Sequence, residues 1–297
     1  MSRFLGALQR RRQQHTQTDE LLSTLIESPS PVAPADAAPA AADRAAGTPE
    51  ALASNMASPY RSVHLVPGPA VLPFVDKRRS AGEQYRIART KIVQHPMQPR
   101  IILVSSAAPR DGKTVTAINI AAALSLKSQA EVLLIDGDIR RGSIPMQLGF
   151  AKTPGLADVL EGRCALEDAI VRTEQLPSLC VLPAGDPELN PAELLDSPSW
   201  VALIAAVRKR FRYVVMDSPP ISAVADYDLL QAVADGVLMV VRPDHTPRKL
   251  LFRTLEAIPP EKLIGVLLNQ VPNWILSGLA DRDYYSQYYA KEYAGRS

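Results

Sequence analysis

Cysteine is scarce in this 297-residue chain, and its four histidines are scattered along the sequence. Cys164 and Cys180 are not spaced as a C-x-x-C pair. The sequence therefore indicates neither a zinc site nor a disulfide framework, in agreement with a reducing cytoplasm. No apolar run approaches the roughly 20 residues that a membrane-spanning helix requires. The formal net charge is only +2, so the composition provides no overall attraction to nucleic acid or to an anionic membrane.

The first 79 residues lack the pattern of a folded domain. The N-terminus has arginines at positions 3 and 10–12 but too few large apolar residues for a secretory signal. Two interpretations stay open for it, a basic amphipathic helix that touches a membrane or a partner, and a solvated tail. Residues 28–73 are rich in Ala and Pro, and such a segment cannot bury enough apolar surface to offset its ordering entropy. We therefore expect residues 1–79 to be a basic N-terminus and a disordered tether, with order resuming near Ser80.

The strongest local signal is a strand, a loop and a helix between residues 101 and 127. An apolar run at 101–104 precedes the loop AAPRDGKT at 107–114, and apolar residues then recur at helical spacing. The loop is a P-loop pattern with Ala107 in place of the first glycine. Its backbone and the helix N-terminus would face phosphates, Lys113 would neutralise β- and γ-oxygens, and Thr114 would bind magnesium. The predicted nucleotide-binding residues are Ala108, Pro109, Arg110, Asp111, Gly112, Lys113, Thr114 and Val115.

Two further apolar runs end in carboxylates. Residues 132–135 lead into Asp136-Gly137-Asp138, and residues 213–216 lead into Asp217. Ligands of open α/β sheets bind at the carboxyl ends of the strands, where these side chains would lie. Asp136 and Asp138 could hold magnesium, orient a nucleophile or accept its proton, and these alternatives stay open. Asp217 stands at the Walker B position, which predicts a magnesium partner.

The order of apolar runs and helical patterns predicts the fold class. Strands are expected at 101–104, 132–135, 179–182, 213–217, 237–241 and 264–268, with helices between them, one from Asn190 to about Arg210. Alternating strands and helices with right-handed crossovers give an α/β fold with a doubly wound, mostly parallel sheet. Asn269 follows the last strand, where it could hydrogen-bond a purine edge or cap a turn. Both readings stay open.

Two segments at the ends of this domain are unusual. A helix is expected from Ser80, and on it Glu83, Arg86 and Arg89 repeat every three residues and share one face. Five of the nine tyrosines lie within the last fourteen residues. Adjacent pairs of them would point in different directions, unlike the stripe of an amphipathic docking helix. A mobile terminus with many phenols indicates hydroxyl groups presented to an active site.

Together these residues resemble the bacterial tyrosine kinases, the autokinases of capsule and exopolysaccharide export. The resemblance covers residues 80–297 and depends on AAPRDGKT at 107–114, LLIDGDIRR at 133–141, VVMDSPP at 214–220 and the tyrosine cluster. GLADVLEG at 155–162, NPAELL at 190–195 and the E-x-x-R-x-x-R spacing are also similar to that family.

The resemblance implies a P-loop NTPase fold of the MinD/ParA-like, deviant Walker type and an ATP- and Mg²⁺-dependent protein-tyrosine kinase. Lys113, Asp136 and Asp138 would be catalytic, and Thr114, Asp136 and Asp217 would hold the metal. Residues 80–280 would form the kinase domain, with Asn269 also at the ATP site, and residues 281–297 the tail. The phosphate acceptors, on a neighbouring subunit, would be Tyr284, Tyr285, Tyr288, Tyr289 and Tyr293.

The same resemblance implies partners. Glu83, Arg86 and Arg89 would join subunits into a ring. A separate membrane-embedded activator of the chain-length-determinant type is expected, with a cognate tyrosine phosphatase and no nucleic acid. The chain would then be cytoplasmic and associated with the inner membrane through that activator.

There are departures and rival interpretations. Gly137 and Gly142 stand where many relatives carry Ala and Pro, and the tail is short. One rival is a ParA/MinD-like positioning ATPase, but such proteins carry a second signature lysine where this chain has residues 108–110, Ala-Pro-Arg. A second rival is a nucleotide-sensing scaffold for polysaccharide export, which the intact Lys113 argues against.

Overall fold

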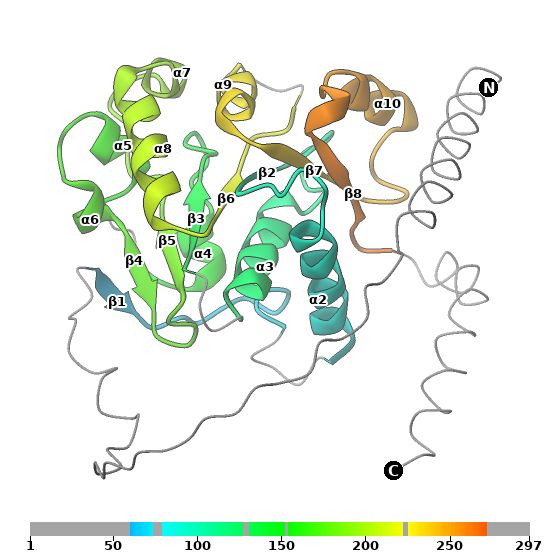
Figure 1. Cartoon of the computed structure of the whole chain (residues 1–297), viewed down its shortest axis with the longest axis horizontal. Helices are drawn as coiled ribbons and strands as arrows, with labels where there is room; N and C mark the ends of the chain where they lie inside the picture. Colours follow the sequence, from blue (N-terminus) through cyan, green and yellow to red (C-terminus); the bar gives the residue numbers. More distant parts are fainter. Residues whose placement is uncertain (1–59, 74–78, 127–130, 152–153, 222–224, 272–297) are drawn as a thin grey trace, which may run out of the picture. The chain divides into compact units, whose positions relative to one another are not determined.

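The structure, a computed structural model, describes residues 60–73, 79–126, 131–151, 154–221 and 225–271. Within these residues the chain forms an eight-stranded sheet with the order β1-β4-β5-β3-β6-β2-β7-β8 (Figure 1). No helix in these ranges is long and apolar enough to cross a membrane. The strands are β1 (Arg61–Val63), β2 (Ile101–Ser106), β3 (Val132–Asp136), β4 (Val171–Thr173), β5 (Leu179–Leu182), β6 (Tyr213–Asp217), β7 (Gly236–Val241) and β8 (Leu263–Leu268).

The sheet is mostly parallel. The strands β5, β3, β6, β2, β7 and β8 all run in one direction, β4 is antiparallel to β5, and β1 is parallel to β4. The helices are α2 (Arg79–Val93), α3 (Lys113–Ser125), α4 (Ile144–Leu148), α5 (Leu156–Leu160), α6 (Leu166–Ala169), α7 (Pro191–Leu195), α8 (Pro198–Arg210), α9 (Asp226–Val233), α10 (Arg248–Glu256) and the 3-10 helix η2 (Pro260–Lys262).

Helices cover both faces of the sheet, so its central strands are apolar along most of their length. Ile101 and Leu103 of β2 belong to the core that includes α5, α7, α8 and α9, whereas Ile102 and Val104 belong to the core with α2, α3 and α4 (Figure 1). This alternation follows from the two-residue period of a strand. The predicted doubly wound fold is therefore confirmed.

The strand order places the predicted site residues at one edge of the sheet. β6 lies between β3 and β2, and in its register Asp217 pairs with Asp136 of β3 and with Val104 of β2. The P-loop follows β2 at this same edge. Residues that are far apart in the sequence thus meet at the carboxyl ends of three neighbouring strands.

The expected start of the domain near Ser80 is wrong. Within residues 60–73, β1 pairs with β4, and the side chains of Tyr60, Val63, Leu65, Val71 and Leu72 are buried. Asn119 of α3 holds the end of this segment, because its Oδ1 accepts a hydrogen bond from the N–H of Leu72 at 2.8 Å and its Nδ2 donates to the carbonyl of Ala70. The prediction was based on the average composition of a Pro-rich segment, and that average did not reveal that five of its apolar side chains pack against the domain. Residues 1–59 lie outside the described ranges.

The single helix expected from Asn190 to Arg210 is two helices. α7 ends at Leu195, and Ser197 begins α8 by accepting a hydrogen bond from the N–H of Trp200 at 3.2 Å. Pro198 has no N–H to continue the earlier helix and suits the first turn of a new one. The helix expected from Ser80 begins at Arg79 as α2.

Candidate active site

The P-loop leads directly into α3. Gly112, with φ 94°, is left-handed, and a Cβ built on it would lie 1.9 Å from Nδ2 of Asn269. Only glycine tolerates both the left-handed backbone and the close approach of Asn269, which explains the glycine of the G-K-T pattern. Lys113 and Thr114 then occupy the first turn of the helix, where free N–H groups point toward an incoming anion.

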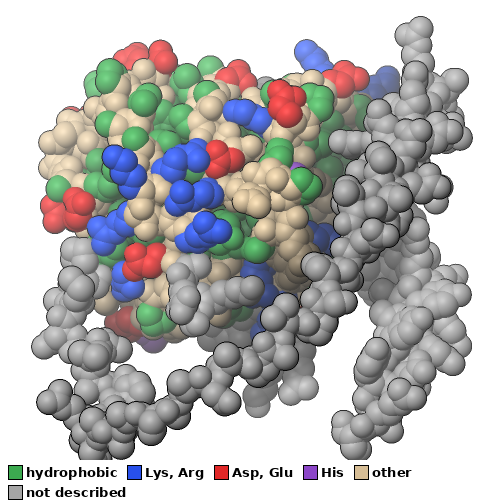
Figure 2. Space-filling view, in the orientation of Figure 1, with side chains coloured by type: hydrophobic (Ala, Val, Ile, Leu, Met, Phe, Trp, Pro, Cys, Tyr) green, Lys and Arg blue, Asp and Glu red, His purple; other side chains and the backbone are tan. Residues whose placement is uncertain are grey.

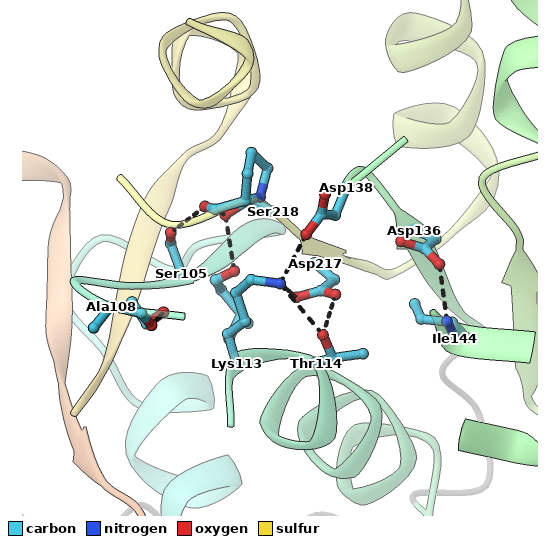
Figure 3. Close-up of polar contacts among 12 residues, drawn as sticks. Ser105, Ala108, Lys113, Thr114, Asp136, Asp138, Ile144, Asp217 and Ser218 are labelled. Atoms are coloured by element: carbon cyan, nitrogen blue, oxygen red, sulfur yellow. Dashed lines mark hydrogen bonds and ion pairs between the residues drawn. The ribbon is translucent and has the colours of Figure 1, made fainter. Parts of the chain in front are cut away.

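Lys113 lies beside two of the predicted carboxylates, Asp138 and Asp217 (Figure 3). Its Nζ is 2.9 Å from Oδ2 of Asp138 and 3.8 Å from Oδ1 of Asp217, and it donates to Oγ1 of Thr114 at 3.4 Å. The side chain is nearly buried, with 9% of its surface exposed. Such a low-dielectric setting strengthens the attraction between the ammonium group and any negatively charged neighbour.

Thr114 and Asp217 form the pair expected of a P-loop and a Walker B strand. Oγ1 of Thr114 donates to Oδ2 of Asp217 at 2.6 Å. Asp217 is fully buried, and this burial raises the pKa of its carboxyl to about 6 against the opposing effects of Lys113 and Thr114. Keeping this buried carboxylate ionised is therefore unfavourable in free energy unless a further cation binds near it.

Asp136 is in a similar position on the neighbouring strand. Its Oδ2 accepts a hydrogen bond from the N–H of Ile144 at 2.9 Å (Figure 3), while its Oδ1 is buried without a hydrogen-bond partner among the described residues. Burial, followed by the nearby Asp217, raises the pKa of Asp136 to about 8. Oδ1 of Asp217 is likewise buried without a hydrogen bond in this part of the chain.

These orphaned oxygens fit a magnesium ion. Buried carboxylate oxygens without a hydrogen bond are unfavourable, and a divalent cation would compensate both of them. In the described residues no group of three His, Cys, Asp or Glu side chains is placed to hold a metal. Mg²⁺ does not need such a group, because it commonly binds one or two carboxylates, a hydroxyl, water and substrate phosphates. Thr114, Asp136 and Asp217 have the side chains that could supply the protein part of such a set.

Asp111 was predicted to bind the nucleotide, but its carboxylate faces the interior of the loop. It is fully buried and accepts hydrogen bonds from the N–H of Ala108 at 3.0 Å and from Oγ1 of Thr246 and Nδ1 of His245, both at 2.9 Å. Its side chain therefore fixes the P-loop to the β7–α10 connection. The sequence analysis missed His245 and Thr246, since nothing local links them to a loop more than 130 residues earlier.

Asn269 also holds the P-loop. Its Nδ2 donates to the carbonyl of Asp111 at 2.9 Å, and its Oδ1 accepts from the N–H of Gln270 at 3.0 Å. The second contact is that of a turn cap, and the first brings the end of β8 against the phosphate loop. Contact with a purine edge stays a prediction.

The charged triad on α2 lies on a different surface. Glu83 and Arg86 form an exposed pair at 3.2 Å, and Nη1 of Arg89 donates to the carbonyl of Ala123 in α3 at 3.5 Å. Glu83 and Arg86 are therefore exposed together, whereas Arg89 reaches toward α3. The tail tyrosines lie outside the described residues.

Comparisons with known proteins identify the family. The model of the AAA domain family matches residues 100–258. Tyrosine-protein kinase YwqD of Bacillus subtilis is 32% identical over 203 residues, which are 67% of this chain and 85% of YwqD. The chain belongs to the bacterial tyrosine-kinase family. The predicted family resemblance is thereby confirmed.

Other members of the family are longer. Succinoglycan biosynthesis transport protein ExoP of Rhizobium meliloti is 34% identical over 204 residues, which are 66% of this chain and 26% of ExoP.

Among solved structures, the kinase domain of Escherichia coli tyrosine kinase ETK matches with a TM-score of 0.61 and 26% identity, covering 67% of this chain and 79% of that one. The MinC:MinD cell division protein complex of Aquifex aeolicus matches with a TM-score of 0.51 and 25% identity over 60% of this chain and 72% of that one. The MinD-like P-loop fold is confirmed as well.

Proposed function

We propose that this chain is a protein-tyrosine kinase that transfers the γ-phosphoryl group of ATP to tyrosines and acts in capsule or exopolysaccharide production. The observation that carries the proposal is the position of Lys113, a nearly buried cation surrounded by Asp138, Asp217 and Thr114. Relatives named as tyrosine kinases and as a succinoglycan transport protein support the substrate and the process.

In the proposed mechanism, the P-loop residues 110–115 hold the phosphates through backbone N–H groups and the start of α3. Lys113 leaves Asp138 and neutralises oxygens of the β- and γ-phosphates. Thr114, Asp136 and Asp217 would hold Mg²⁺, which would supply positive charge to offset the charge that develops on these phosphates. The Thr114–Asp217 hydrogen bond at 2.6 Å orients both of these ligands before substrate arrives.

Asp138 is the best placed of the two carboxylates to act as the base. It lies on the loop after β3 with 9% of its side chain exposed, whereas Asp136 is fully buried and hydrogen-bonded to Ile144. The phenol oxygen would form a bond to the γ-phosphorus as the bond to the β–γ bridging oxygen breaks. The phenol proton would pass to Asp138, since a phenol with a pKa of about 10 is a weak nucleophile until it is deprotonated.

The tail supplies the acceptors in this proposal. Replacing Tyr284, Tyr285, Tyr288, Tyr289 and Tyr293 by Phe should remove phosphotyrosine from the protein and leave ATP affinity unchanged, because all the residues proposed to bind the nucleotide are kept. Incubation with ATP followed by mass spectrometry measures the product. A Tyr85→Phe, Tyr213→Phe variant is the matched control and should be labelled normally. Undiminished labelling of the tail variant would refute the acceptor assignment.

Assembly into a ring is proposed to depend on α2. Glu83→Ala combined with Arg86→Ala and Arg89→Ala should give a smaller particle by light scattering, since these side chains would pair across the subunit boundary. Gln84→Ala with Lys91→Ala changes exposed residues on another side of the same helix and should leave the mass unaltered. Equal masses for wild type and the triple variant would contradict the role of this face.

The remaining partners follow from the kinase proposal. The ring would be stimulated by a separate membrane-embedded activator and reset by a tyrosine phosphatase, with the chain cytoplasmic and held at the inner membrane by the activator. Several phosphates on each tail, at about −1.5 to −2 charge each, would make the tails repel and loosen the ring. Hydrolysis of ATP without any phosphotyrosine would instead favour a positioning ATPase.

A further inference from the structure

The edge of the sheet opposite to the candidate active site is lined with charge. Five neighbouring parallel strands begin there, and each is preceded directly by a charged residue. In the order β3, β6, β2, β7, β8 these residues are Glu131, Arg212, Arg100, Asp235 and Lys262. The helix α8 ends at this edge with Arg208, Lys209 and Arg210. Figure 2 shows Lys and Arg side chains gathered on this part of the visible face.

The two acidic residues of this row are already neutralised. Nη2 of Arg208 is 2.7 Å from Oδ1 of Asp235, and Nη2 of Arg172 is 2.7 Å from Oε1 of Glu131. The pKa of Asp235 is lowered by its hydrogen bonds to Arg208 and to the backbone, even though burial opposes this. Each of these two carboxylates is thus matched by one arginine.

Two other cations donate hydrogen bonds to backbone carbonyls. These contacts satisfy the donors, but a carbonyl does not neutralise the positive charge. Nη2 of Arg100 donates to the carbonyls of Arg208 and Phe211 at 2.8 and 2.9 Å. Nζ of Lys262 donates to the carbonyl of Gln231 at 2.7 Å. Both contacts fix a full positive charge at this edge.

Three more cations project from the edge. Lys209, Arg210 and Arg212 are exposed, and none of them has an ion-pair partner among the described residues. With Arg100 and Lys262 they form what we call the basic face, five uncompensated positive charges in a chain whose total is only +2.

A helix end explains part of this pattern but not all of it. Cations in the last turn of a helix offset its dipole, which accounts for Lys209 and Arg210. Arg212 and Lys262 lie outside α8, directly before β6 and β8. A row of cations that continues past the helix across several strands indicates a polyanionic ligand.

We propose that the basic face binds the surface of a membrane that contains anionic lipids. A flat array of cations suits such a surface, since lysine and arginine close to an anionic leaflet each add to the attraction. Arg210 also contacts the first described residue, since its guanidinium carbon lies 4.3 Å from the ring centre of Tyr60.

The opposite positions of the two edges make this contact compatible with the proposed kinase. The length of β6, five residues, separates Arg212 from Asp217 at the nucleotide site. Asn269, from which the tail continues, lies against the P-loop at that second edge. A domain lying on lipid by its basic face would keep its P-loop and Asn269 turned away from the membrane, accessible to nucleotide and to an acceptor tyrosine. The membrane contact does not depend on kinase activity.

Sedimentation of the full chain with lipid vesicles tests this proposal. We expect binding to vesicles that contain phosphatidylglycerol, no binding to pure phosphatidylcholine, and release as ionic strength rises from about 0.01 to about 0.15 M, which shortens the screening length from roughly 30 to 8 Å. Lys209→Glu with Arg210→Glu and Arg212→Glu should lower the partition coefficient at least ~10-fold. Arg210 contacts Tyr60, so its replacement could also disturb folding. A second variant, Lys209→Gln with Arg212→Gln, keeps this contact and should also bind the anionic vesicles more weakly than the wild type does.

The matched control changes three exposed basic residues of α10, as Arg248→Glu, Lys249→Glu and Arg253→Glu. It alters the total charge equally and should keep most of the lipid binding. An equal loss in this control, or no vesicle binding by the wild type at low salt, overturns the proposal. Tighter binding to duplex DNA than to the anionic vesicles would also overturn it, by assigning the basic face to nucleic acid.

Discussion

Lys113→Met should reduce phosphotyrosine formation at least ~100-fold, the size of effect found when one charge-stabilising donor is removed from a transition state. Met fills a similar volume but leaves the γ-phosphoryl group without its cation, and it leaves Asp138 and Asp217 facing each other. Radiolabelled ATP, with phosphotyrosine analysis of the protein, measures the rate. Circular dichroism establishes that the variant is folded, because loss of a buried partner also lowers stability.

The control for this variant is Lys249→Met, which removes an exposed lysine of α10 and should be labelled at the wild-type rate. Labelling of Lys113→Met at a similar rate would contradict the catalytic role. A mixture separates transfer within a chain from transfer between chains. When Lys113→Met, which keeps its tyrosines, is mixed with the active variant that carries five tail phenylalanines, transfer between subunits predicts label on the Lys113→Met chain. No label in that mixture would mean that each chain modifies only itself.

The second large effect is expected at Asp136, where activity and stability should change in opposite directions. Asp136→Asn should remove most of the kinase activity, because a magnesium ligand is lost. In the absence of Mg²⁺ it should nevertheless raise the Tm above that of the wild type. The amide keeps an oxygen to accept the hydrogen bond from the N–H of Ile144, and it carries no charge that must be buried.

The pH dependence follows from the raised pKa of Asp136, which is about 8 when folded and 3.8 in its ordinary state. Between these values the folded chain binds more protons than the unfolded chain at this group, so its contribution to stability falls as pH rises and is lost above about 8. One pKa unit corresponds to about 1.4 kcal/mol. Since about 1 kcal/mol shifts the Tm of such a domain by roughly 2–4 °C, the variant should gain at least ~3 °C at a pH above this range.

Thermal unfolding with EDTA and with Mg²⁺ and nucleotide checks this expectation. Wild type should gain stability when Mg²⁺ and nucleotide are added, and Asp136→Asn should gain much less. Asp196→Asn, an exposed residue with no side-chain hydrogen bond or ion pair in the described part of the chain, is the control and should behave as wild type. A Tm of Asp136→Asn below that of the wild type in EDTA would show that the buried charge does not lower the stability of the folded chain.

The P-loop shows which features of the site could be predicted from short stretches of sequence. The order strand, A-x-x-x-x-G-K-T, helix predicted the P-loop, and the apolar runs that end in Asp136 and Asp217 predicted the two neighbouring strands. These signals are local, since backbone geometry and buried strands leave short patterns. The contacts that fix the loop, from His245 and Thr246 to Asp111, leave no such pattern. They form only because the β7–α10 connection lies beside the P-loop in the folded chain.

The sequence by itself determined the fold class, the family and the positions of the P-loop pattern and of the acidic residues at the strand ends, because each depends on residue type at fixed short spacing. Only the tertiary structure decided that residues 60–73 belong to the domain, and that the Asp111 carboxylate supports the loop from within. It also decided that Arg100, Arg212 and Lys262 meet on one edge. These features depend on which strands become neighbours, and long-range pairing is set by burial over the whole chain, which no short pattern records.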